Sequence, residues 1–562
     1  MDKSTPSLNF SAAFLAGDPR ALAFLPASFR DPKARLERAR ERAWRQVPPR
    51  LLELLHEQDR ALPPSEARRR HIDALGRPGT LVVATGQQVG LFLGPLYTFY
   101  KAASAVALAR AIEAESGLRT VPLFWLQTED HDFPEVDHCH VLRPGGESVR
   151  LTLRDEAAGQ PEAGRVSLAH RRLGEDVREL VVALEQALEE RPHAAEFLAL
   201  VREHYQPGRT LPAAFAGLLA SLFAEEGLIV FDPRAAPVAR LAASIYHRAI
   251  VSADAVAEKL LERVQALRAA GFTEQVHVRP GSPLVFFHEH AATGPRYRLE
   301  RHGQAWTLVG RGSSAGAPGQ EGHAVTIGAD ELLTTLDADP LRFSTSALLR
   351  PIVQDTLLPT VAYVGGPGEI NYFAQLGPLY DFFDLVPPLV VPRARFRCID
   401  ARTRSLLGRF GLTPRDAERP REELVQSLAA AALPAGLPAP DPLSARLLAD
   451  FSRELEAFSS GLSALTPPLD PKLADAVRRT RGTAERAVER LVARYRRALG
   501  ARTDLAGERI ERLTGFLFPG GEPQERHYSL AYFVAQMGVS AFKAEVLRHL
   551  DPYDPAVRDI DL

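Results

Sequence analysis

The sequence predicts an α/β protein built on a mostly parallel, doubly wound sheet. Short apolar runs rich in β-branched residues alternate with longer helical patterns, and each run is bounded by glycine or proline. Strands that are buried on both faces have this continuous apolar character. The runs are LVVATG (81–86), VPLFWLQ (121–127), GLIVFDP (227–233), PTVAYVGGPGE (359–369) and PPLVVPRA (387–394).

The first two runs enclose a helical pattern from Leu96 to about Ile112. Pro95 stands just before it, where a helix start tolerates proline. Strand, helix and strand within so short a stretch fit the crossover that joins two parallel strands. Residues 81–127 therefore predict a βαβ unit.

Upstream of this unit, residues 31–62 predict one amphipathic helix that serves as a packing element. Arginine and glutamate recur there with helical spacing. Apolar residues stand between them at Leu36, Trp44, Leu51, Leu52 and Leu55.

A chain of 562 residues is too long for one hydrophobic core, so two or three domains are expected. Two stretches interrupt the strand-and-helix pattern and are interpreted as insertions. The predicted division is core at 1–142, insertion at 143–210, core at 211–269, insertion at 270–335, core at 336–397, helical coiled coil at 398–505, and a segment at 506–562 that returns to the core.

The coiled-coil prediction depends on two heptad-like rows separated by prolines. The first row is Phe451, Leu455, Phe458, Leu462 and Leu465, and the second is Val477, Ala484, Val488, Leu491 and Tyr495. Two antiparallel helices with an apolar seam follow from this spacing. An ordinary helical hairpin buried on the core remains an alternative.

The composition excludes several classes of protein. Apolar residues make up 45% and charged residues 25% of the chain, as in globular proteins, and the net charge of −2 provides no general attraction to nucleic acid or to a membrane surface. No apolar run is long enough to span a bilayer. Two cysteines cannot form a disulfide framework, so a reducing cytoplasm is expected.

The turn ATGQQVGLFLGP (84–95) is the first candidate binding motif. It places glycines between a strand and a helix start, where free backbone N–H groups attract anions such as phosphate or carboxylate. Its spacing matches neither the dinucleotide fingerprint nor the P-loop, and a plain tight turn is the alternative. Lys101 is either solvated or reaches back toward the pocket. The candidate binding residues are Thr85, Gly86, Gln87, Gln88, Gly94 and Lys101.

The segment TEDHDFPEVDH (128–138) directly follows the second strand, where open α/β sheets bind ligands. Its titratable side chains favour general acid–base catalysis or binding of an amine. A divalent metal site and a capped polar loop are the alternatives, and Cys139 beside His138 and His140 is either a ligand, a reactive thiol or a buried inert residue. The candidate catalytic residues are Glu129, Asp130, His131 and Asp132.

A second glycine turn follows the fourth run, at residues 365–368. The groups after it suit recognition of hydroxyl or amino groups, although a glutamate at a helix start can also be a cap. The candidate binding residues here are Gly366, Gly368, Glu369, Asn371 and Tyr372. Near the C-terminus, Glu525, Arg526 and His527 either close over the site or pin the end of the chain.

The sequence resembles the bacillithiol biosynthesis family of cysteine ligases, the BshC enzymes. The matching segments are TGQQVGLFLGPLYTFYKAASA (85–105), VPLFWLQTEDHDFPEVDH (121–138), LRPIVQDTLLPTVAYVGGPGEINYFAQL (349–376) and LFPGGEPQER (517–526). The resemblance implies a Rossmann-like core with two connecting-peptide insertions, a coiled coil that promotes a homodimer, and ligation of L-cysteine to the amino group of glucosaminyl malate.

A carboxylate is a poor acyl electrophile, so this reaction needs activation, and ATP and Mg²⁺ are the inferred cofactors. In that reaction Gln87, Gln88 and Lys101 would hold phosphate or carboxylate groups. The acids and His131 would bind the amine or move its proton. The HIGH and KMSKS signatures of aminoacyl-tRNA synthetases are absent from the sequence.

Two other functions remain open at this level. One is a nucleotide-binding group transferase that does not use cysteine. The other is a non-catalytic nucleotide-binding protein that uses its coiled coil as a docking arm.

Overall fold

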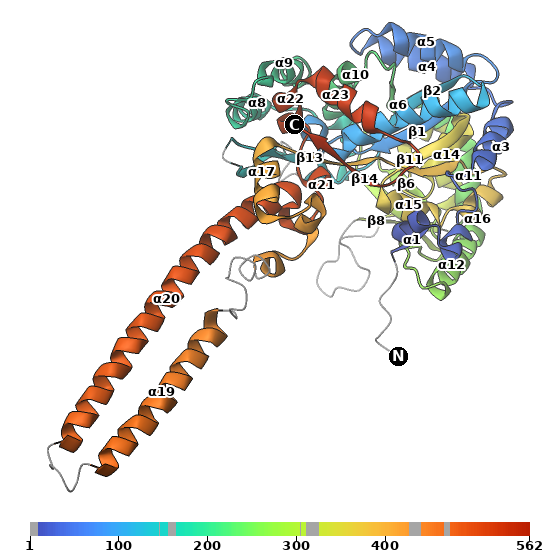
Figure 1. Ribbon diagram of the computed structural model, residues 1–562. Coiled ribbons are helices and arrows are strands. Elements are labelled where there is room, and N and C mark those ends of the chain that lie inside the picture. The colour runs from blue at the N-terminus through green and yellow to red at the C-terminus, as the bar shows by residue number, and fades with distance from the viewer. Residues whose placement is uncertain are drawn as a thin grey trace. The chain divides into compact units, whose positions relative to one another are not determined.

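The computed structural model describes residues 9–144, 146–155, 165–303, 305–310, 325–425, 440–465 and 473–562 (Figure 1). The chain divides into two compact units. The core unit comprises Met1–Arg397 and Glu525–Ile560 together with Leu562, and the helical unit comprises Cys398–Gln524 together with Asp561. The predicted insertion boundaries inside the core unit stay a prediction.

A five-stranded parallel sheet forms the centre of the core unit, which confirms the predicted doubly wound fold. Its order is β12-β11-β1-β2-β5. The strands are β1 (Leu81–Gln87), β2 (Thr120–Leu126), β5 (Ile229–Phe231), β11 (Thr360–Gly365) and β12 (Leu389–Pro392). Val82, Leu123 and Val364 are wholly buried, as expected of strands covered on both faces.

The strand order reverses direction beside β1. The chain runs from β1 through α6 (Tyr97–Ser116) to β2 on one side, and from β11 through α15 (Pro367–Phe373) and α16 (Gly377–Phe382) to β12 on the other. Right-handed crossovers that run in opposite directions lie on opposite faces of a sheet, which leaves a crevice at the carboxyl ends of the strands where the order reverses. This switch point lies between β1 and β11.

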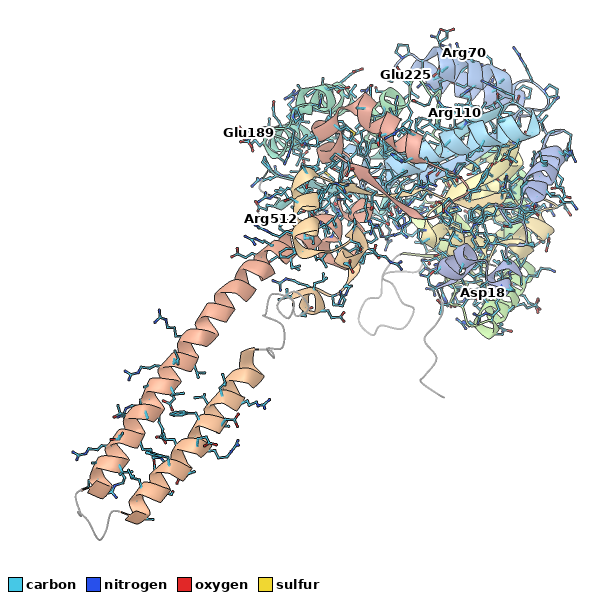
Figure 2. All side chains as sticks on the ribbon, viewed as in Figure 1. Asp18, Arg70, Arg110, Glu189, Glu225 and Arg512 are labelled. Carbon is cyan, nitrogen blue, oxygen red and sulfur yellow. The ribbon has the colours of Figure 1, made fainter. Side chains whose placement is uncertain are left out.

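Other helices surround the sheet, and charged side chains such as Arg70 and Glu189 point outward from the core unit (Figure 2). These helices are α1 (Phe10–Ala16), α2 (Pro19–Leu22), α3 (Pro32–Arg42), α4 (Pro49–Arg60), α5 (Glu66–Leu75), α7 (Phe133–Val136), α8 (Asp176–Ala187), α9 (Ala194–His204), α10 (Leu211–Leu222), α11 (Ala236–Val251), α12 (Ala253–Ala269), α13 (Ala329–Ala338), α14 (Arg350–Leu357), α22 (Ala531–Met537) and α23 (Val539–His549).

The single helix predicted for residues 31–62 is wrong. The segment forms α3 and α4, and α4 begins at Pro49 with Pro48 as its N-terminal cap. Proline lacks the N–H that would continue the helix through this point, so the break follows from the paired prolines. Trp44, counted among the packing residues, is 76% exposed in the connection between the two helices.

A second, antiparallel sheet lies within the stretch interpreted as the second insertion and ends just beyond it. Its order is β10-β6-β7-β8-β9. The strands are β6 (Val285–His288), β7 (Arg296–His302), β8 (Ala305–Val309), β9 (Thr326–Gly328) and β10 (Phe343–Thr345). The first insertion contains β4 (Ser148–Thr152), which pairs with β3 (His138–Leu142) at the end of the preceding core segment, and then α8 and α9.

In the helical unit, α17 (Ala401–Phe410) precedes two long helices, α19 (Pro440–Leu465) and α20 (Leu473–Leu517), which pack along each other as predicted (Figure 1). The prolines predicted to separate them fall in residues 466–472, outside the described ranges.

The predicted seam needs correction at two positions. Phe458 and Leu491 are 67% and 66% exposed, whereas their neighbours Ser459 and Val492 are buried. One residue turns an α-helix by about 100°, so a phase error of one position exchanges a buried site for an exposed one.

Within the described ranges, no helix combines the length and the apolar character needed to cross a lipid bilayer.

Candidate active site

A cavity of about 590 Å³ lies within the core unit at the switch point. Its walls come from the segments after β1, β2 and β11 and from the antiparallel sheet. The polar lining residues are Gln87, Gln88, Tyr97, Lys101, Gln127, Glu129, Asp130, His131, Glu135, Gln275, Arg296, Arg298, Thr345, Ser346, Arg350, Glu369, Tyr372, Arg393 and Arg526.

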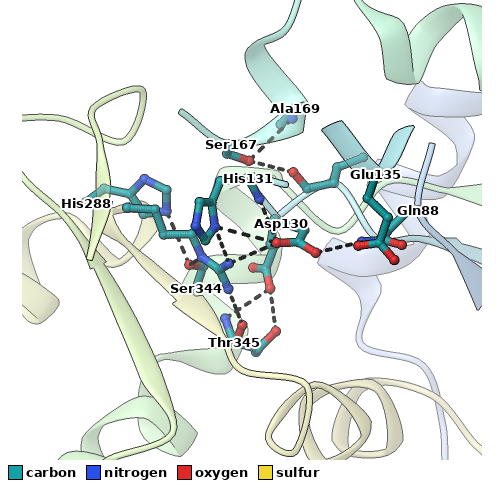
Figure 3. A network of polar contacts seen from close by, with 12 residues as sticks. Gln88, Asp130, His131, Glu135, Ser167, Ala169, His288, Ser344 and Thr345 are labelled. Carbon is teal, nitrogen blue, oxygen red and sulfur yellow. Dashed lines mark hydrogen bonds and ion pairs between the residues drawn. The ribbon is translucent and has the colours of Figure 1, made fainter. Parts of the chain in front are cut away.

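One side, here called the acidic wall, consists of Glu129, Asp130 and Glu135 with Gln88. The amide Nε2 of Gln88 donates to Asp130 Oδ2 and to Glu135 Oε2, at 2.8 Å each (Figure 3). Glu129 Oε2 accepts hydrogen bonds from the backbone N–H of Thr345, at 3.0 Å, and from its hydroxyl. These contacts fix the direction of each carboxylate.

Asp130 is held in its ionised form. Burial by itself would raise the pKa of its carboxyl, but the charge of Arg296 and hydrogen bonds from the His131 N–H and Gln88 outweigh burial and lower the pKa. His131 Nδ1 lies 3.2 Å from Arg296 Nη1 and 3.5 Å from Asp130 Oδ1. An anionic carboxylate and an imidazole therefore face the same space.

Arg296 belongs to β7, in the antiparallel sheet, and completes the acidic wall. Its Nε donates to Ser344 Oγ at 3.0 Å, and its Nη2 donates to the Thr345 carbonyl at 2.7 Å. Its guanidinium carbon lies 3.8 Å from the centre of the Phe286 ring. The second insertion thus supplies part of the site that follows the Rossmann-like strands.

His288 supports Arg296 from behind. Its Nε2 lies 3.2 Å from Ser344 Oγ (Figure 3). Its Nδ1 lies 3.0 Å from the Gly294 carbonyl oxygen. Burial and then the charge of Arg234 lower the pKa of His288 to about 2. The ring is therefore neutral at physiological pH and donates from Nδ1 to the carbonyl.

The opposite side, here called the basic wall, contains Lys101, Arg350 and Arg393 around Glu369. Lys101 is buried, and its Nζ lies 2.8 Å from the Gly86 carbonyl, 2.9 Å from Gln87 Oε1 and 2.5 Å from Glu369 Oε2. An ammonium has three hydrogens, and these three acceptors use them all. Lys101 therefore reaches the pocket, but it joins the two glycine turns to each other.

Glu369 is ionised within this wall. Burial would raise the pKa of its carboxyl, but the Lys101 ammonium, the Tyr363 hydroxyl and the Gly366 N–H outweigh burial and lower the pKa. The Tyr363 hydroxyl donates at 2.6 Å and the Gly366 N–H at 2.8 Å. Glu369 is a helix cap and a counterion at once, because Gly366 precedes the first residue of α15.

The segment near the C-terminus contributes to this wall as well. Arg393 Nη2 forms an ion pair with Glu525 Oε1 at 2.8 Å, and both side chains are buried. Arg526, the next residue, lines the cavity. The segment therefore both anchors the chain, through Glu525, and contributes to the site, through Arg526.

Most of the candidate residues meet at the cavity. Those that line it are Gln87, Gln88, Lys101, Glu129, Asp130, His131, Gly366, Gly368, Glu369 and Tyr372. Their roles in catalysis or binding stay predictions. Arg296, Arg298, Arg350, Arg393, Tyr97 and Glu135 also line it and were missed. Among the lining arginines, Arg350, Arg393 and Arg526 stood in segments that the sequence marked, whereas Arg296 and Arg298 did not.

The other candidates lie elsewhere. Thr85 Oγ1 donates to the Val364 carbonyl within the sheet, Asn371 Oδ1 accepts from the Ser11 N–H at 2.8 Å, and Asp132 is the N-cap residue of α7. Gly86 and Gly94 are glycines because the backbone at each position leaves no room for a side chain or adopts a positive φ. A Cβ on Gly86 would lie 2.8 Å from the Trp125 carbonyl oxygen, and Gly94 has a φ of +63°.

In the described part of the chain, no group of three or more His, Cys, Asp and Glu side chains is arranged to hold a metal ion. Cys139 is buried, and burial raises the pKa of its thiol to about 12, so it is an inert residue. Its neighbours His138 and His140 alternate with it along β3 and point to the other face.

Comparison with known proteins identifies the family. Residues 3–394 match the family model described as bacillithiol biosynthesis BshC, N-terminal Rossmann-like domain, and residues 399–558 match the C-terminal coiled-coil domain. The chain belongs to the BshC family. This confirms the resemblance seen in the sequence, and the BshC assignment covers both structural units.

Individual BshC relatives align over most of their length. Each of the following carries the provisional name cysteine ligase BshC. The protein from Koribacter versatilis is 33% identical over 87% of this chain and 85% of its own. The one from Solibacter usitatus is 35% identical over 83% and 82%, and the one from Salinibacter ruber is 33% identical over 84% and 81%.

Proposed function

We propose that this BshC protein is an ATP-dependent cysteine ligase that joins L-cysteine to the amino group of glucosaminyl malate. The observation that carries the proposal is one cavity with the carboxylates of Glu129, Asp130 and Glu135 on one side and buried cations on the other. Such a cavity can hold an amine and carboxylates at the same time. The names of the relatives supply the identity of the cysteine substrate.

The chemistry assigns a task to the acidic wall. The amine nitrogen attacks the carbonyl carbon of activated cysteine, the bond from that carbon to the leaving oxygen breaks, and one proton leaves the nitrogen. Asp130 is ionised and faces the cavity, and His131 lies beside it. We assign removal of the proton to this pair, and orientation of the amine to Glu129 and Glu135.

The residues present fit ATP and Mg²⁺. When bound, ATP would supply the group that converts the cysteine carboxylate into an acylating agent. Arg393 and Arg526 line the cavity on the basic wall. Arg393 uses one N–H on Glu525 and one on the Ala394 carbonyl, so its other donors remain for a triphosphate. Mg²⁺ bound through phosphates needs only one or two protein carboxylates, and Glu135 can provide one without occupying the Asp130–His131 pair. Lys101 has no remaining hydrogen for a phosphate, so we assign it to positioning Gln87.

The test is reconstitution. Purified protein is incubated with L-cysteine, ATP, Mg²⁺ and glucosaminyl malate, and the amide product is measured by mass spectrometry. Product that requires ATP supports the proposal, and the release of AMP or ADP identifies the activated form. Turnover of ATP without cysteine incorporation would instead favour a group transferase, and binding without turnover would favour an interaction protein.

We also propose a homodimer formed through the helical unit, in the cytoplasm. The support is the set of exposed apolar side chains on α19 and α20, namely Leu447, Phe458, Leu462 and Leu491. Light scattering of Phe458→Ser/Leu491→Ser tests this, and an unchanged dimer mass would contradict it. Both cysteines are free and buried, which suits a reducing compartment.

A further inference from the structure

Arg350 is a buried cation in the cavity wall, and it has an unusual set of partners. It is the first residue of α14, and only 6% of its surface is exposed. Its Nη1 donates to Gln354 Oε1 at 2.9 Å and its Nη2 donates to the Tyr372 hydroxyl at 2.8 Å. Both acceptors are neutral oxygens.

Four other cations of the cavity have a carboxylate partner. The Nζ of Lys101 lies 2.5 Å from Glu369, and Nη2 of Arg393 lies 2.8 Å from Glu525. Arg298 is paired with Glu300 at 2.6 Å, and Arg296 with Asp130 at 3.6 Å. For Arg350, no carboxylate in the described residues lies within the 4.0 Å of an ion pair.

A buried charge without a counterion is costly unless a ligand supplies one. Glu369 is the acid whose charge acts on Arg350, but it already binds Lys101 and Tyr363. A guanidinium has five N–H donors, and two are used by Gln354 and Tyr372. The others remain for an anion in the cavity.

The guanidinium is also held in a fixed orientation. Gln354 stands four residues later on α14, Tyr372 is on α15, and the guanidinium carbon lies 5.0 Å from the centre of the Tyr363 ring. A cation that is already oriented loses little conformational freedom on binding, so it suits the planar, two-point recognition of a carboxylate.

We propose that Arg350 binds a malyl carboxylate of the amine substrate, and this inference rests on the proposed ligase function. The carboxylate of cysteine is the less suitable anion, because it loses its charge when it is activated. A triphosphate carries several charges and needs several cations. The malyl carboxylates keep their charge throughout the reaction, which matches one fixed guanidinium.

The test compares Arg350→Gln with the unmodified protein on two amines. One is glucosaminyl malate, and the other is an analogue whose malyl carboxylates are converted to amides. We expect KM for glucosaminyl malate to rise about 10- to 100-fold, which is the effect of losing a charge-assisted hydrogen bond. KM for cysteine and for ATP should stay unchanged, and the analogue should react equally with both proteins.

The matched control is Arg263→Gln. Arg263 also donates to neutral oxygens only, the Ala374 carbonyl at 2.9 Å and the Phe24 carbonyl at 2.8 Å, but it lies outside the cavity. Its loss should leave every KM unchanged. Calorimetry with free L-malate provides a reading that needs no turnover, and malate should bind the unmodified protein more tightly than Arg350→Gln.

A rise in KM for cysteine or ATP, or an equal loss with both amines, overturns the proposal by assigning Arg350 to another ligand or to the fold. If Arg350→Gln does not fold, Arg350→Lys decides by the same comparison, because it keeps the charge and loses the planar fork. If the unmodified protein makes no product, the ligase function itself fails. In that case malate binding that depends on Arg350 still supports the carboxylate site, and its absence overturns it.

Discussion

The acidic and basic walls of the cavity contain similar chemical groups in different states. The side chain of Asp130 is 34% exposed and is oriented by the Gln88 amide and by the backbone N–H of His131. The side chains of Lys101 and Glu369 are 4% and 14% exposed, and they satisfy each other. A charged group in a cavity is therefore available to a ligand only where the protein has not already paired it. The acidic wall can act on substrate, whereas Lys101 and Glu369 shape the site.

The largest effect is expected from the acidic wall. Asp130→Asn and His131→Ala should each lower kcat by about 10²- to 10⁴-fold, because each removes a group that moves the proton of the amine. The thermal midpoint should change little. Product formation by mass spectrometry, with a thermal unfolding curve for each variant, checks both expectations.

Asp132→Asn is the matched control, since this acid is two residues from Asp130 but lies outside the cavity lining. It should retain activity within a few-fold. A loss equal to that of Asp130→Asn would show that the whole acidic segment matters, and the assignment to the wall would fail.

The basic wall should respond through stability. Lys101→Met leaves the buried Glu369 without its cation, and breaking one partner of a buried pair costs about 3 to 5 kcal/mol. The double variant Lys101→Met/Glu369→Gln should recover much of this loss. Urea unfolding measures the free energy of each variant.

A Lys101→Met variant that kept its stability and lost its activity would contradict the structural role of Lys101. That result would mean that the Lys101 ammonium binds a ligand instead of joining the two glycine turns.

A smaller, pH-dependent effect is expected from His288, behind the acidic wall. Its pKa is about 2 in the folded protein and near 6.5 in the unfolded chain, so below pH 6.5 only the unfolded state takes up a proton. Stability is therefore lost as pH falls, by up to about 1.4 kcal/mol per pH unit.

His288→Asn keeps a donor near the Gly294 carbonyl and removes this titration. Between pH 7.5 and 5 its unfolding free energy should fall less steeply than that of the unmodified protein. Parallel curves would mean that His288 takes up its proton equally in both states.

The smallest effect is expected for Gln88→Met. The Gln88 amide is one of the groups that lower the pKa of Asp130, so its removal should raise that pKa. Asp130 must be ionised to accept a proton, and the acid limb of the rate–pH profile should move upward by less than about one pH unit. An acid limb that does not move would show that the ionisation of Asp130 does not control the rate.

The parts of this fold that were predictable are those with local causes. The five core strands are continuous apolar runs, and the glycine turns and the acidic segment directly follow three of them. The carboxyl ends of parallel strands meet at one edge, so the sequence could place Gln88, Asp130 and Glu369 around one site.

The remainder depends on contacts between distant residues. Arg296 reaches His131 across 165 positions, and its segment showed only the alternation of an ordinary strand. Lys101 stayed ambiguous because α6 is buried along most of its length and offers no polar face from which to assign it.

The break before Pro49 has a local cause and could have been predicted from the sequence, because two adjacent prolines interrupt a helix.

The neighbours of β1 also determine when this enzyme can be completed. β1 hydrogen-bonds to β2 shortly after it in the chain, but its other edge waits for β11, and Thr85 donates to a residue 279 positions later. At about 5 to 20 residues per second, a ribosome needs roughly 15 to 55 s to supply that partner. During this interval the nascent chain carries an unpaired apolar strand edge, a surface that invites aggregation. The late return of β11 therefore prolongs the time for which this strand edge is exposed during synthesis.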